Sequence, residues 1–274
     1  MKIALIGAGG KMGVRLSQNL KGSRFNVAHV EVSDAGRDRL KAEVGVDCVD
    51  VDAALEDARA VILAVPDTAI RAVAKSIIDK LAPGTMLIAL DAAAPFAGHF
   101  PERKDVTYFV THPCHPPIFN DETQLPAKRD YFGGIAAKQA IVNALMQGPE
   151  EDYAIGEEIA KTIFQPILRS HRVSVEQMAL LEPGLSETVC ATLLVVMKEA
   201  MDEVIRRGVD PVAARDFLLG HMNILGAVVM EEVDGVFSDA CNKAITNGKK
   251  RLMRDDWIGV FKPDEIRESI RQIT

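Results

Sequence analysis

The sequence lacks the features that mark nucleic-acid-binding and membrane-embedded proteins. Its 32 basic side chains are outnumbered by 39 acidic ones, which gives a formal net charge of −7. A nucleic acid or an anionic membrane calls instead for a basic surface. No uninterrupted apolar run approaches the roughly 18 residues of a membrane span; the run Leu193 to Met197, for example, stops at Lys198. We therefore expect no nucleic-acid partner and no membrane partner.

Cysteine is scarce and scattered. The four cysteines show none of the close pairing of a zinc ribbon or a redox motif; they are Cys48, Cys114, Cys190 and Cys241. In a chain of this size they indicate reduced thiols and a cytoplasmic protein. The short apolar run from Ile3 to Ile6 is expected to form a strand instead of a signal peptide.

The remaining composition is that of a soluble globular protein. Apolar residues make up 48% of the 274 residues and charged residues 26%, which is too apolar for a disordered chain. A chain of this length forms one large domain or two modest ones.

Short apolar runs alternate with helical segments in the first part of the chain, which predicts an α/β fold with a parallel sheet. The predicted strands are residues 3–6, 26–32, 59–65, 85–90 and 106–111, with a further strand and helix within 134–163. From about Ser174 the pattern is helical only, and Ser174 with Gln177 fits a capping box. We therefore predict a first domain over residues 1–173 and an all-helical domain over residues 174–274.

A glycine-rich turn joins the first predicted strand to the first predicted helix. It reads Gly7-Ala8-Gly9-Gly10-Lys11-Met12-Gly13. Glycines let the backbone approach a pyrophosphate, whose charge is stabilised by the N–H groups at the start of the helix. The spacing departs from the strict fingerprint, because Met12 occupies the sixth position. We interpret the turn as a dinucleotide-binding site, with a merely tight strand–helix turn as the alternative.

An acidic residue follows the second predicted strand. Glu31 can accept hydrogen bonds from the adenosine ribose and repel a 2′-phosphate. The next two residues include no arginine that could receive that phosphate, which favours NAD over NADP. Asp34 is the competing choice, and a solvated glutamate is the functionless alternative. Val65 and Pro66, which end a predicted strand, are expected to lie along the cofactor.

Two histidines follow another predicted strand, in the turn Thr111-His112-Pro113-Cys114-His115-Pro116-Pro117. Ligands bind at the carboxyl ends of parallel strands, and a histidine there can serve as a general base or a metal ligand. Surface histidines in a stiff loop are the alternative. We expect the substrate chemistry at this turn.

Two carboxylates, Glu182 and Glu187, flank a Pro-Gly bend near the domain junction. Glu187 is predicted to meet His115 and hold a divalent metal, because one imidazole with one or two carboxylates leaves positions open for substrate. The alternative is that Glu187 only complements a helix dipole. His112 and Glu182 are the candidates for moving the substrate proton.

The helical half offers weaker candidates. His221 and Asn223 lie on a late helix, and a basic group at Lys243, Lys249, Lys250 and Arg251 suits either a substrate carboxylate or solvent. An apolar face formed by Val189, Leu193, Val196 and Ala200 predicts a homodimer interface, although a buried core face explains it equally well.

The glycine turn, the strand Val61 to Pro66 and a Rossmann half followed by a helical half resemble the 6-phosphogluconate and 3-hydroxyacid dehydrogenase superfamily. The lysine that 3-hydroxyacid dehydrogenases carry on their first long helix is absent between Glu187 and Met197. The turn from His112 to Pro117, together with Glu182 to Glu187, resembles the D-apionate oxidoisomerases of bacterial apiose catabolism.

That resemblance implies NAD-dependent, metal-assisted oxidation of a branched sugar acid, followed by an α-ketol rearrangement from D-apionate to 3-oxo-isoapionate. The logic is that of ketol-acid reductoisomerases run in the opposite sense, and zinc, manganese or magnesium would suit it. Two alternatives remain open: a simple NAD-dependent hydroxy-acid dehydrogenase, and a non-catalytic NAD-binding sensor whose helical half serves dimerisation.

Overall fold

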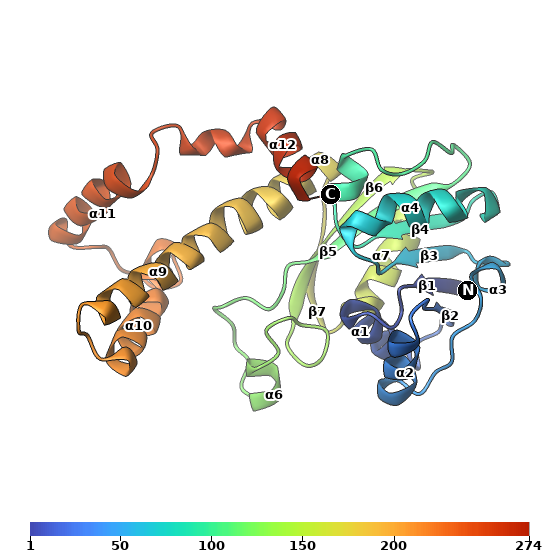
Figure 1. Cartoon of the computed structure of the whole chain (residues 1–274), viewed down its shortest axis with the longest axis horizontal. Coiled ribbons are helices and arrows are strands. Elements are labelled where there is room, and N and C mark those ends of the chain that lie inside the picture. Colours follow the sequence, from blue (N-terminus) through green and yellow to red (C-terminus); the bar gives the residue numbers. More distant parts are fainter. Residues whose placement is uncertain (274) are drawn as a thin grey trace. The chain divides into compact units, whose positions relative to one another are not determined.

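The computed structural model describes residues 1–273, which form two compact units (Figure 1). The first unit comprises Met1–Glu182 together with the residues from Arg267 onward, and the second, here called the helical unit, comprises Pro183–Ile266. The division predicted near residue 173 falls within the first unit, nine residues before Glu182. That predicted domain boundary stays a prediction.

A seven-stranded sheet is the centre of the first unit, in the order β2-β1-β3-β4-β5-β6-β7. Strands β1 to β5 are parallel, which confirms the predicted α/β architecture. Strand β6 pairs with β5 in the antiparallel sense and β7 pairs with β6 in parallel, so the last two strands run against the others. The strands are β1 Lys2–Ile6, β2 Asn26–Val30, β3 Ala60–Leu63, β4 Met86–Ala89, β5 Thr107–Pro113, β6 Gln139–Gln147 and β7 Ile167–Arg172.

Helices cover both faces of this sheet, and each face has its own apolar core. Alternate residues of β1 point to opposite faces, so that Ala4 and Ile6 join one core while Ile3 and Leu5 join the other. The first core contains side chains from α3 Val51–Leu55, α4 Asp67–Ile77, η1 Ile78–Lys80, α5 Ala93–Phe96 and α8 Val175–Ala179. The second core contains side chains from α1 Lys11–Leu20, α2 Asp34–Glu43 and α7 Asp152–Ile163, and a short α6 spans Leu125–Lys128.

Local signals in the sequence account for several helix ends. The predicted capping box is present: the Ser174 hydroxyl accepts from the Gln177 amide, and the Gln177 side chain accepts from the Ser174 amide. Asp210 caps the next long helix by accepting from two backbone amides, with proline at the first helical position. These caps satisfy amides that the first helical turn leaves without a partner.

The helical unit consists of long helices joined by open loops. Segment η2 is broken at Glu182, whose backbone is extended just before Pro183. The elements are η2 Leu180–Ala191, α9 Thr192–Arg206, α10 Pro211–Val229, α11 Asp239–Leu252, η3 Trp257–Phe261 and α12 Pro263–Ile273, of which the first and last also reach into the first unit. No residue of α9 is buried. The predicted face around Leu193 and Val196 is therefore not a core face within the helical unit.

Two helical stretches are long and apolar enough by composition to cross a membrane, Val175–Arg206 and Pro211–Val229. The first of these is broken at Glu182 and Pro183 and so is not one continuous helix. The second carries Arg215, Asp216 and His221 within its span. We regard the protein as soluble.

Candidate functional site

The glycine turn forms a close-packed cradle between β1 and α1. Gly7 has a φ of +81°, and a Cβ there would lie 2.4 Å from the Ala64 carbonyl oxygen. A Cβ on Gly13 would lie 2.1 Å from the Gly7 carbonyl oxygen. Glycine is thus required both for the backbone conformation and for the packing of α1 against the strand end, as a dinucleotide-binding turn needs.

Glu31 lies directly beside this cradle. One carboxylate oxygen accepts from the Gly9 amide at 3.0 Å, and the other accepts from the Val32 and Ser33 amides at 2.8 and 2.9 Å. Burial raises the pKa of Glu31, but these hydrogen bonds and one from the Ser33 hydroxyl outweigh it and lower the pKa below its ordinary value. The carboxylate is therefore fixed and ionised where an adenosine ribose is expected.

Two other charged residues, Asp34 and Arg37, lie close to Glu31 in the sequence. Asp34, the alternative candidate for binding the adenosine ribose, has a side chain that is 97% exposed. Arg37 has no distinguishing signal in the sequence, and its guanidinium donates to the Glu31 carbonyl oxygen at 2.8 Å. A cationic group is thus present at this end of the cradle, although it does not directly follow the strand.

A cavity of about 280 Å³ extends from the glycine turn to the ends of β3 and β4. The cavity is lined by five of the residues that the sequence predicts to bind the cofactor or to lie along it, namely Gly10, Lys11, Met12, Val65 and Pro66. Asp67 and Asp91 also line it. The cavity therefore connects the predicted cofactor site with a group of acidic side chains.

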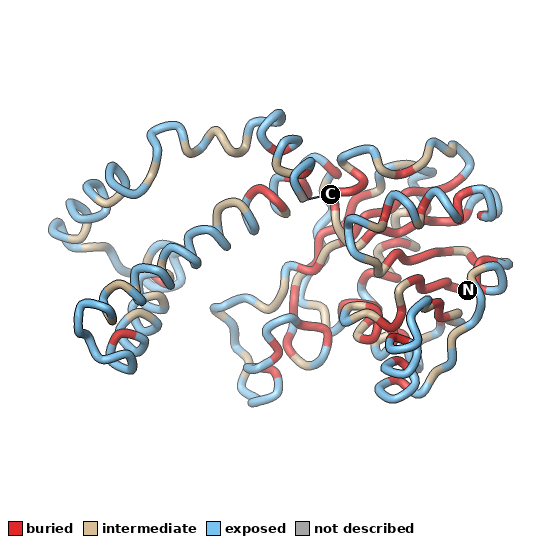
Figure 2. The backbone as a smooth tube through the Cα atoms, in the orientation of Figure 1, coloured by how far each residue is buried: buried red, intermediate tan, exposed pale blue. Residues whose placement is uncertain are grey.

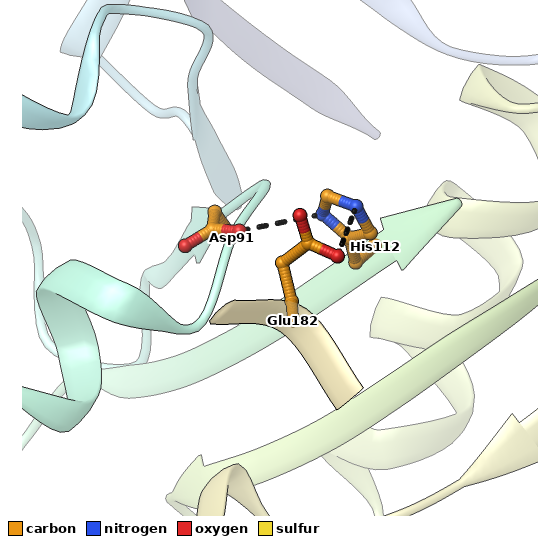
Figure 3. A group of neighbouring side chains, drawn as sticks. All are labelled: Asp91, His112 and Glu182. Carbon is orange, nitrogen blue, oxygen red and sulfur yellow. Dashed lines mark ion pairs between the residues drawn. The ribbon is translucent and has the colours of Figure 1, made fainter. Parts of the chain in front are cut away.

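The side chains of Asp91, His112 and Glu182 lie close together near the carboxyl ends of β4 and β5 (Figure 3). His112 lies on β5, Asp91 lies two residues after the end of β4, and Glu182 comes from the break in η2. One ligand atom from each of the three lies within 4.8 Å of the others. Their side chains are only 18 to 20% exposed. The structure thus brings together two predicted residues, His112 and Glu182, with a third that the sequence did not single out.

The His112 ring is oriented by the backbone. Its Nδ1 lies 2.9 Å from the Leu90 carbonyl oxygen, which can only accept, so Nδ1 carries the proton when the ring is neutral. Nε2 then presents a lone pair toward the Glu182 carboxylate oxygen, 3.6 Å away. The two facing lone pairs repel each other, and a proton or a cation between them would remove this repulsion.

The electrostatics around His112 are dominated by negative charge. Burial, followed by the charges of Asp91 and Glu182, raises the pKa of Asp67, while His112 lowers it. Three carboxyl groups thus surround one imidazole in a partly buried region. Such an arrangement has the donor types of a divalent-metal site, two carboxylates and a neutral imidazole.

His115 lies near this group but is not part of it. Its backbone has a φ of +61°, its Nδ1 lies 2.9 Å from the Phe132 carbonyl oxygen, and its ring centroid is 6.1 Å from that of His112. Glu187 belongs to the helical unit. A metal site formed by His115 and Glu187 therefore stays a prediction.

The other weak candidates belong to the helical unit. His221 stacks on Phe217, with ring centroids 4.0 Å apart, and its Nδ1 lies 2.8 Å from the Phe217 carbonyl oxygen. The basic group from Lys243 to Arg251 lies on α11. Their roles in substrate binding stay predictions.

Comparison with known proteins places the chain in a family. The family described as the NAD binding domain of 6-phosphogluconate dehydrogenase matches residues 2–96, and phosphogluconate dehydrogenase (decarboxylating) C-term matches residues 120–274. D-apionate oxidoisomerases of Rhizobium rhizogenes and Cupriavidus necator are 71% and 68% identical, over 99% and 100% of this chain and 99% of each relative. The chain belongs to the D-apionate oxidoisomerase family.

A solved structure of high sequence identity has the same fold. A semialdehyde dehydrogenase NAD-binding protein from Cupriavidus necator, in complex with calcium and NAD, is 68% identical with a TM-score of 0.99. The match covers 100% of this chain and 99% of that chain. With the NAD-binding domain also matched by its family, the predicted oxidoreductase class, NAD cofactor and superfamily are confirmed.

Proposed function

We propose that this protein is an NAD-dependent, metal-assisted oxidoisomerase that converts D-apionate to 3-oxo-isoapionate in the cytoplasm, as part of carbohydrate catabolism. Relatives of nearly full length carry the name of this activity. The single observation that carries the proposal for this chain is the group of Asp91, His112 and Glu182 beside the cavity that begins at the glycine turn. A small-molecule sugar acid is the expected substrate.

Asp91, His112 and Glu182 are the residues that fit a divalent cation best. Their carboxylates are hard oxygen donors, and Nε2 of His112 is an available nitrogen donor. Burial raises the pKa of Asp67, and repulsion from Asp91 and Glu182 raises it further; a cation would offset that repulsion. The set His115 and Glu187 is the alternative proposal, because the sequence predicts it.

When bound, NAD supplies a hydride acceptor and a divalent cation supplies a Lewis acid for two neighbouring substrate oxygens. The protein's own groups have separate tasks. A carboxylate oxygen of Glu182 that is not bound to the cation would take the proton of the substrate's secondary alcohol. Nε2 of His112 would take that proton if the cation were held by His115 and Glu187 instead, because Nδ1 is held by the Leu90 carbonyl. Glu31 and the glycine turn bind the adenosine and pyrophosphate ends of NAD.

One experiment separates the proposal from its two alternatives. NADH production from D-apionate is measured before and after EDTA treatment and after addition of Mg²⁺, Mn²⁺ or Zn²⁺, and the carbon skeleton of the product is determined by NMR. We expect activity to disappear with EDTA and return with metal, and the product to be rearranged. An unrearranged 2-oxo acid formed without metal would establish a simple dehydrogenase, and NAD binding without turnover would establish a sensor.

A further inference from the structure

Arg169 lies on β7, the strand at one edge of the sheet. This strand has no buried residue, whereas β3 and β4 are buried throughout (Figure 2). The Ser170 hydroxyl donates to Glu157 of α7 at 2.6 Å, and Arg172 forms an ion pair with Glu150 just before α7. Both side chains thus point to the face that α7 covers. Because successive side chains of a strand point to opposite faces, Arg169 points to the other face.

The strand register places Arg169 in line with the histidine turn. The Cys114 amide donates to the Ala140 carbonyl oxygen of β6 at 2.9 Å, and Ala140 is paired with Arg169. His112, two residues before Cys114, is paired with Val142, which belongs to the core on the face opposite α7. Arg169 is therefore on the same face of the sheet as His112, in the next row of residues on that face.

The side chains of this row lie close to the acidic group. Neighbouring strands are about 4.8 Å apart, so two such spacings separate the backbones of Cys114 and Arg169. Ala140 lies between them and has only a methyl group as its side chain. Desolvation raises the pKa of the Cys114 thiol, the charge of Arg169 lowers it, and the charge of Glu182 raises it. Arg169 and Glu182 thus both lie within electrostatic range of the same sulfur.

The guanidinium of Arg169 has no partner among the residues that the structure describes, 1–273, where it forms neither a hydrogen bond nor an ion pair. Other arginines of the first unit do have partners. Arg172, on the same strand, donates to Glu150 at 2.8 Å, and the guanidinium of Arg15 lies over the Phe132 ring. Arg169 is therefore a fixed positive charge available to an anion.

A sugar acid needs such a charge at this site. Asp67, Asp91 and Glu182 supply three carboxyl groups, a divalent cation offsets two negative charges, and the substrate adds a further carboxylate. A cation that holds two neighbouring hydroxyl oxygens of the substrate leaves the substrate carboxylate without a partner. A guanidinium binds a carboxylate through two parallel hydrogen bonds and cannot lose its charge.

We propose that Arg169 binds the carboxylate of the substrate and makes the enzyme select a sugar acid over its neutral analogues. This inference rests on the proposed function. It also orients the substrate, with the carboxylate directed toward β7 and the reacting carbons toward the ends of β4 and β5. Arg169 is a binding residue in this account and takes no part in the proton transfer.

Kinetics with two substrates test the assignment. One is D-apionate and the other is D-apionamide, in which a neutral amide replaces the carboxylate. In Arg169→Gln the KM for D-apionate should rise by about 10- to 100-fold, with little change in kcat, because the contact is equal in the ground and transition states. The kcat/KM for D-apionamide should stay at its wild-type value. Arg169→Lys, which keeps the charge without the fork, should lie between the two, and Arg172→Gln is the matched control with unchanged KM.

A binding measurement makes the test independent of turnover. In the presence of NADH, which cannot accept a hydride, calorimetry gives the dissociation constant of D-apionate. It should rise by the same factor in Arg169→Gln, while NADH binds as it does to the wild type. Unchanged values for D-apionate, or an equal loss with D-apionamide, would overturn this inference and leave the proposed function standing. A wild-type protein that does not oxidise D-apionate would overturn the proposed function and this inference with it.

Discussion

Nε2 of His112 lies 3.6 Å from a carboxylate oxygen of Glu182, while the Nδ1 of the same ring is held by the Leu90 carbonyl. The ring therefore has one nitrogen fixed by the backbone and one nitrogen directed at an acid. Asp91 lies on the other side of the ring, with an oxygen 3.6 Å from Nδ1. This relationship gives the first two predictions.

Replacing either carboxylate should weaken metal binding without unfolding the protein. Asp91→Asn and Glu182→Gln keep the shape of each side chain and remove one charged ligand, so Mn²⁺ affinity measured by calorimetry should fall by about 100-fold or more. His115→Gln is the matched control and should bind Mn²⁺ as the wild type does. Loss of binding in His115→Gln and Glu187→Gln, with no change in the other two, would support the alternative ligand set instead.

His112→Gln should retain NAD binding but lose turnover. The amide lacks the imidazole nitrogen that either binds the cation or takes the proton of the substrate alcohol, and general-base catalysis alone is worth about 10²- to 10⁴-fold in rate. We expect kcat to fall by that factor while the NAD dissociation constant, measured by fluorescence titration, stays within about twofold. A kcat near that of the wild type would show that His112 neither binds the cation nor takes the proton.

Glu31 is expected to determine the coenzyme. In Glu31→Ser the carboxylate that repels a 2′-phosphate is gone, while Arg37 remains beside the site to attract one. The ratio of kcat/KM for NAD over NADP should therefore fall by about 10- to 100-fold. Adding Arg37→Gln to the Glu31→Ser variant should abolish the increase in kcat/KM for NADP. If the ratio did not change, the adenosine ribose would not be bound at Glu31.

The ionisation of Glu31 also gives a pH dependence. Its pKa is lowered in the folded state, so the ionised carboxylate stabilises the fold above the ordinary glutamate pKa of about 4.3. That stabilisation is lost as the pH falls through the lowered value. Urea unfolding at pH 7 and at pH 3 to 4 should show a smaller difference between the two pH values for Glu31→Gln than for the wild type. An identical difference would show that the hydrogen bonds to Glu31 do not affect stability.

Gly7→Ala should destabilise the first unit strongly. The substitution combines a positive φ, which disfavours alanine by about 1 to 2 kcal/mol, with a Cβ only 2.4 Å from a backbone carbonyl. Gly98 has a φ of +73°, and a Cβ there would meet no atom within 4 Å, so Gly98→Ala isolates the conformational part. Chemical denaturation should show a clearly larger loss for Gly7→Ala. Equal losses would mean that the cradle is not close-packed.

The parts of this fold with local signals could be predicted from the sequence. The strand–glycine–helix unit, the capping box at Ser174 and the cap at Asp210 each depend on residues close together in the chain. The direction of β6 could not be predicted, because the 25 residues between β5 and β6 allow either a crossover or a return, and apolar pattern does not record strand direction.

The candidate site was predictable only in part. His112 stood out because of its position at a strand end, and Glu182 because of the Pro-Gly bend. Asp91 also follows a predicted strand at the same edge of the sheet, and this position could have identified it as a candidate. A single aspartate at a strand end is common, however, and does not by itself indicate a site. The apolar face of α9 was visible as a pattern, but a pattern does not say what covers it.

The most direct test of the metal proposal is a crystal structure grown with NAD and Mn²⁺, with data collected at the manganese absorption edge. We predict an anomalous peak in contact with oxygens of Asp91 and Glu182 and with Nε2 of His112. A peak held by other residues, His115 and Glu187 included, with none among these three, would contradict the account.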